Sequence, residues 1–167
     1  MIDKGRLNDA IDPLLRGAAI SGPAAQRRAT ATALLRLGIE LAQRHGFADA
    51  LRIHVRAAAV FAELGEVEQE LQCLIFTGIC EWQLKAYESA VQIFETIAGR
   101  ALSAGKSAFR AQAMLSISCI LVDHLRQYQR AVPYAAEAAR LSRSRGDHEQ
   151  AAHALRHLDE ARREGNA

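Results

Sequence analysis

Apolar residues recur along the chain with the spacing of an amphipathic α-helix. One stripe has i, i+3, i+4, i+7 spacing and consists of Leu34, Leu37, Gly38 and Leu41. A second stripe runs from Ala50 to Leu64, and Gly46 and Gly65 follow the two stripes at positions where a helix is expected to end. Because such a stripe marks the buried face of a helix, this segment predicts two helices joined by a short turn.

The same pattern extends over the whole chain and predicts an all-α fold. Ala is frequent, Gly and Pro are few, and no run of β-branched residues interrupts the helical spacing. About eight helices are expected, over residues 8–20, 24–45, 48–64, 67–85, 88–104, 107–126, 130–145 and 147–164.

A small residue recurs every 40 or 41 residues, at Ala10, Ala50, Ala90 and Ala131. A large apolar or aromatic residue precedes it by three positions each time, as Leu7, Phe47, Tyr87 and Tyr128. A small side chain at a fixed phase lets two helices of a hairpin approach closely, whereas a large one would separate them. The period therefore predicts a repeated antiparallel helical hairpin.

This pattern resembles the tetratricopeptide repeat (TPR), in the long-helix form of kinesin light chains and many bacterial regulators. The first repeat carries the family's positions as Leu34, Leu37, Gly38, Leu41, Phe47, Ala50, His54 and Ala57. The second has Leu74, Thr77, Gly78, Glu81, Tyr87, Ala90, Phe94 and Ile97, and the third has Leu115, Ser118, Cys119, Val122, Tyr128, Ala131, Ala135 and Ala138. Departures from the family pattern are His54, Thr77, Ser118 and Glu81.

The resemblance implies a right-handed α-solenoid that forms a single domain over residues 1–167. Its expected parts are a half repeat at 1–22, repeats at 24–65, 66–105 and 107–146, and a capping helix at 147–164.

Composition and charge narrow the classes of function. The net charge of +2 is too small to indicate nucleic-acid binding, and no apolar stretch reaches the roughly 20 residues of a membrane span. The N-terminus has no apolar core of a secretory signal, and the three Cys lie in helical patterns as buried thiols. These features predict a cytoplasmic protein with no membrane or nucleic-acid partner.

No motif for catalysis is present, so the chain is expected to be non-enzymatic and to need no cofactor. There is no Gly-rich phosphate loop, no Cys-x-x-Cys pair and no nucleophile motif. His153 and His157 lie four residues apart, a spacing that can bind metal, and Asp123 and His124 could complete such a site. The favoured interpretation is a solvated polar face near a capping helix, with no metal.

The TPR resemblance implies that the first helix of each hairpin lines a concave groove for a protein or peptide. The apolar residues at groove positions are Ile39, Phe76, Ile79, Trp82, Ile117 and Ile120, and the polar ones are Arg36, Gln43, Gln83, Asp123 and His124. Large exposed apolar patches usually mark interaction sites. A tightly coiled array or a homodimer would bury the same side chains, and this alternative stays open.

Trp82 is the only Trp, and the repeat does not require it, because its counterparts are Ala42 and Asp123. We therefore expect Trp82 to contact a bound apolar segment. Two functions follow from these features: a protein-binding module, or a regulatory or sensory segment of a larger signalling protein that controls an output domain.

The opening half repeat predicts self-association. Its apolar face, made of Leu7, Ile11, Leu14 and Leu15, has no partner helix on one side, and exposed solenoid edges tend to be capped or paired. The isolated chain is expected to form a dimer in light scattering. A clean monomer of 18.2 kDa at high concentration would contradict this.

Overall fold

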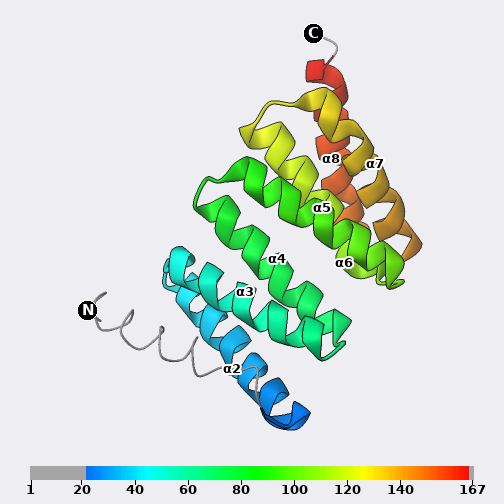
Figure 1. The fold of residues 1–167 in the computed structure, drawn as a ribbon. Helices are drawn as coiled ribbons and strands as arrows, with labels where there is room; N and C mark the ends of the chain where they lie inside the picture. Colours follow the sequence, from blue (N-terminus) through cyan, green and yellow to red (C-terminus); the bar gives the residue numbers. More distant parts are fainter. Residues whose placement is uncertain (1–21, 166–167) are drawn as a thin grey trace. The chain divides into compact units, whose positions relative to one another are not determined.

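The computed structural model describes residues 22–165 as helices and short turns, with no strand among them (Figure 1). The α-helices are α2 (Ala24–Gln43), α3 (Phe47–Glu63), α4 (Val67–Gln83), α5 (Tyr87–Ser103), α6 (Ser107–Cys119), α7 (Tyr128–Ser144) and α8 (His148–Gly165). A π-helix, η1 (Ile120–His124), continues α6. The all-α prediction is confirmed. The expected helix at 8–20, and with it the apolar face around Leu7, lies outside the described residues.

The chain divides into two compact units, Met1–Leu84 and Lys85–Ala167. In the first unit α3 packs against both α2 and α4, and α2 also touches α4. In the second unit α6 packs against α5 and α7, and α8 packs on α7 and touches α6. Within each unit the helices therefore follow the hairpin pattern expected from the sequence, while the single domain over 1–167 stays a prediction.

Apart from the direct continuation of α6 into η1, every connection between the described helices has three residues and contains one residue with positive φ. These residues are His45, Gly65, Lys85, Gly105, Arg126 and Gly146. Glycine adopts this left-handed conformation without the steric cost that a Cβ brings. The positive-φ residue is a glycine in the turns after α3, α5 and α7, and it is His, Lys or Arg in the turns after α2, α4 and η1. The turns therefore repeat with the period of the hairpins. We call α2, α4 and α6 first helices, and α3, α5 and α7 second helices.

The third period is one residue longer than the others, and η1 contains the extra residue. Helix α6 begins 40 residues after α4, but α7 begins 41 residues after α5. The Leu125 amide donates to the Ile120 carbonyl at 3.1 Å, the i to i−5 bond of a π turn. The counterpart of Gly78 is therefore Ser118, which is fully buried, and the alignment of Gly78 with Cys119 is wrong by one position.

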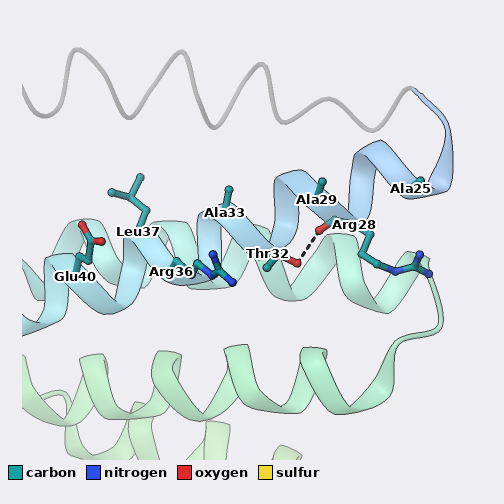
Figure 2. A pocket seen from close by; sticks show the side chains of 8 residues that line it. All are labelled: Ala25, Arg28, Ala29, Thr32, Ala33, Arg36, Leu37 and Glu40. Carbon is teal, nitrogen blue, oxygen red and sulfur yellow. Dashed lines mark hydrogen bonds between the residues drawn. The ribbon is translucent and has the colours of Figure 1, made fainter.

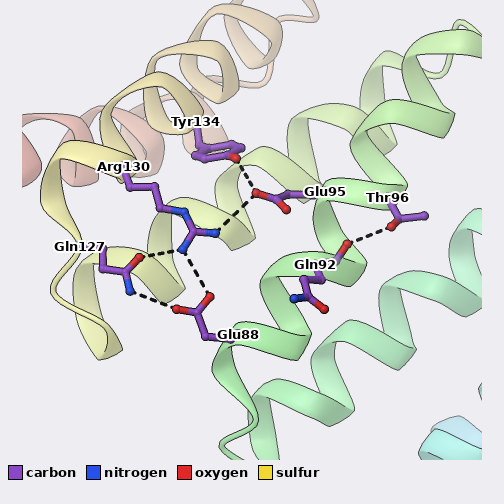
Figure 3. Close-up of polar contacts among 7 residues, drawn as sticks. All are labelled: Glu88, Gln92, Glu95, Thr96, Gln127, Arg130 and Tyr134. Atoms are coloured by element: carbon purple, nitrogen blue, oxygen red, sulfur yellow. Dashed lines mark hydrogen bonds and ion pairs between the residues drawn. The ribbon is translucent and has the colours of Figure 1, made fainter.

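A polar network links the second helices of the second unit (Figure 3). Arg130 lies 3.3 Å from Glu88 and 3.7 Å from Glu95, and Tyr134 donates to Glu95 at 2.6 Å. Gln127 also donates to Glu88, at 3.0 Å. Because exposed ion pairs contribute little energy, this network adds little to the stability of the second unit.

Small buried residues set the approach of neighbouring helices. Ala50, Ala90 and Ala131 have no exposed surface, as the repeat predicted. Gly38 of α2 faces the buried His54 of α3 so closely that a Cβ on Gly38 would lie 2.5 Å from the imidazole ring. The same ring stacks on Phe76 with centroids 5.1 Å apart. The first unit thus fits a histidine into a helix contact because the facing residue lacks a side chain.

Gly38→Ala should destabilise the chain by about 1–3 kcal/mol, the usual cost of overpacking. Gly99→Ala is the matched control, because Gly99 is also helical but exposed, with no atom within 4 Å of an added Cβ. It should stabilise the chain by about 0.5–1 kcal/mol through helix propensity. Urea unfolding measures both, and equal effects of the two substitutions would contradict the close contact.

Burial lowers the pKa of His54 to about 4. The unfolded chain, with an imidazole pKa of about 6.5, binds this proton at higher pH than the folded chain does. Stability from a neutral His54 is therefore fully present above pH 6.5 and falls as the pH drops toward 4, by up to about 3 kcal/mol. His54→Phe should flatten this part of the unfolding profile, and an unchanged slope would show that His54 is not the group responsible.

Candidate functional site

The first unit exposes part of the predicted groove. Ile39 of α2 and Phe76, Ile79 and Trp82 of α4 are all half-buried. We call these four residues the first-helix strip. Ile39 and Phe76 also pack against the core of the unit, so each presents only part of its surface. The polar residues predicted to flank the strip are exposed: Arg36, Gln43 and Gln83.

The second unit does not present its predicted apolar residues. Ile117 and Ile120 are fully buried and do not lie on an open surface. The extra residue in η1 explains the difference. Before the π turn each residue corresponds to the one 40 positions earlier, so Ile117 and Ile120 correspond to Thr77 and Cys80, which are both buried. A 41-residue spacing from Phe76 and Ile79 holds only after the turn. The structure therefore does not bring all the predicted groove residues together.

Asp123 and His124 follow the point of insertion and are exposed, as a groove position requires. The His124 ring stacks on Tyr87, with centroids 4.5 Å apart and planes at 6°. It therefore packs within the second unit, and it belongs to neither group of potential metal ligands found among the described residues.

An open pocket of about 600 Å³ lies along α2, and the predicted groove residue Arg36 is one of those that line it (Figure 2). Its lining residues are Ala25, Arg28, Ala29, Thr32, Ala33, Arg36, Leu37 and Glu40. Arg28 already pairs with Glu66. The lining offers a small-residue surface between charged side chains, which suits packing of another chain segment, and none of these eight residues is a nucleophile activated by a neighbouring base.

The second unit gathers a thiol and two imidazoles into one cluster. Cys119 Sγ lies 3.3 Å from His157 Nε2 and 3.9 Å from His153 Nε2, and the two Nε2 atoms are 3.0 Å apart. Helix α8 places the two histidines one turn apart on one face, and Cys119 is the last residue of α6. Asp123 lies on the π turn that follows Cys119, and its Oδ1 is 3.8 Å from Nδ1 of His157.

Burial governs the chemistry of this cluster. It raises the pKa of the Cys119 thiol to about 12, and the Asp123 carboxylate adds to the shift. Burial also lowers the pKa of His153, and His157 adds to that effect. At neutral pH Cys119 is therefore a thiol and His153 a neutral imidazole.

The prediction that the two histidines lie on a solvated face is wrong for His157, of which only 8% is exposed. The sequence pattern predicts Cys119 only as a buried thiol and does not indicate its place beside the two histidines. With the phase that α6 has in the structure, Cys119 takes the groove position of Ile79, but the spacing in the sequence alone does not fix that phase.

A second pocket, of about 400 Å³, adjoins the cluster. It is lined by Leu115, Asp147, Glu149, Gln150, Ala152, His153 and Arg156. Since His153 belongs to both the pocket and the cluster, a small solute can reach the edge of the cluster from solvent.

No protein-family model matches the chain, and a comparison with curated proteins finds no significant match. Within residues 22–165, no helix combines the length and apolar character needed to cross a membrane.

Proposed function

We propose that the chain is a non-enzymatic protein-binding module of the TPR type, which holds a peptide or helix against its first helices. The first-helix strip carries this proposal: four large apolar side chains on α2 and α4 keep part of their surface exposed, and Gln43 and Gln83 lie exposed beside them. Aromatic anchors within a polar rim are typical of protein interfaces.

The chemistry of the second unit supports binding over catalysis. Cys119 is the strongest candidate nucleophile in a polar cluster of the described residues, yet only 5% of it is exposed and its thiol is protonated at neutral pH. The thiolate is the reactive form of cysteine, so this group is poorly suited to attack a substrate.

Trp82→Ala should weaken partner binding by roughly 30-fold or more, because loss of an interface anchor costs about 2 kcal/mol. It should cost clearly less stability than the about 3–5 kcal/mol of a buried aromatic residue, since Trp82 is only half-buried. Partners are first captured from a cell extract on the immobilised chain and identified by mass spectrometry, and their affinities are then measured with purified proteins.

Val55→Ala is the matched control, because Val55 is apolar and 51% exposed but lies on the second helix α3 of the same unit. A partner that uses the first-helix strip binds wild type and Val55→Ala alike. Equal binding to Trp82→Ala, or a stability loss of the size of a core residue, would remove the support for this surface.

A further inference from the structure

We propose that Cys119, His153 and His157 bind a divalent transition-metal ion of the zinc class. One thiol sulfur and two imidazole nitrogens converge from α6 and α8, and all three ligand atoms lie within 4.8 Å of one another. Thiolate and imidazole are the donors that zinc prefers, and three protein ligands are a common number for a zinc site with an open position.

The distances fit tetrahedral coordination. Zn–N bonds of about 2.05 Å and a Zn–S bond of about 2.3 Å place two nitrogens about 3.3 Å apart and sulfur about 3.6 Å from nitrogen. The cluster has 3.0 Å between the nitrogens, and 3.3 and 3.9 Å between sulfur and each nitrogen. Side-chain adjustments of a few tenths of an ångström would bring all three to one ion.

No single hydrogen bond joins all three groups of this cluster. A neutral imidazole Nε2 either donates one proton or accepts one through a single lone pair. His157 Nε2 faces both the Cys119 sulfur and His153 Nε2, so it can bond only one of them. A metal ion takes a lone pair from both imidazoles and from the Cys119 thiolate, and the thiol proton passes to solvent when the metal binds.

The far side of His157 supplies the outer shell that such sites use. Nδ1 of His157 is buried and has no hydrogen-bond partner among the described residues, while Asp123 Oδ1 lies 3.8 Å away. When Nε2 binds a metal, Nδ1 carries the proton, and a carboxylate that accepts it orients the ring. Asp123 is therefore a positioning residue, and Glu160 offers a second carboxylate near the same ring.

The test uses the full chain without a histidine tag, freed of metal by chelator dialysis and titrated with Co²⁺ alone. Wild type should bind one Co²⁺ per chain and show thiolate-to-cobalt charge-transfer absorption together with the visible bands of four-coordinate cobalt. Zn²⁺ should displace the cobalt and raise the Tm, because it binds only the folded chain tightly.

Two ligand variants, one variant of the positioning residue and one control test the site. Cys119→Ser should abolish the charge-transfer absorption, and His153→Gln, at a half-exposed position, should weaken binding by about 100-fold or more. Asp123→Asn should keep the spectrum but lower the affinity by about 10–100-fold. His148→Gln, an exposed histidine of the same helix, should change neither.

Circular dichroism confirms that each variant is folded. Absence of charge-transfer absorption in wild type would overturn the proposal, and so would an unchanged spectrum in Cys119→Ser. An affinity of folded His153→Gln equal to that of wild type would overturn it as well. None of these results depends on partner binding by the first-helix strip.

Discussion

Close approach of neighbouring helices through small buried residues is the constraint on which the structure depends. Ala50, Ala90 and Ala131 are fully buried at one phase of the repeat, and Gly38 accepts the ring of His54 where any Cβ would collide with it. Packed interiors tolerate little change in volume, so the phase of these positions is fixed. A residue inserted into a helix must then be absorbed locally, without rotating the next contact out of place.

The π turn η1 is where such an insertion is absorbed. It restores the phase of the repeat by Tyr128, so that Ala131 is buried as its counterparts are. Single π turns often occur at functional sites, because they redirect side chains within an otherwise regular helix. Here the turn follows Cys119 directly and carries Asp123, the residue nearest to Nδ1 of His157.

Much of the fold could be predicted from the sequence because it follows from local patterns. Apolar stripes and turn glycines place the described helices within a few residues of their observed ends. The register of the third repeat could not be fixed in this way, since an extra residue anywhere between Ser107 and His124 gives the same spacing downstream. A 41-residue spacing applied before the extra residue predicts Ile117 and Ile120 in the groove, but both are buried.

The cluster around Cys119 was hidden for a different reason. Cys119 lies 34 and 38 residues before the two histidines in sequence, and only the packing of α8 against α6 brings them together. The residue types are also not what the helical pattern predicts. A buried contact between helices is normally apolar, and an incompletely paired polar group there lowers stability. At the corresponding phase α4 has Ile79, an apolar residue that is half-buried. A thiol and two imidazoles at this contact are physically consistent when one ligand binds them together, and the proposed metal ion is a ligand whose coordination distances they approach to within a few tenths of an ångström.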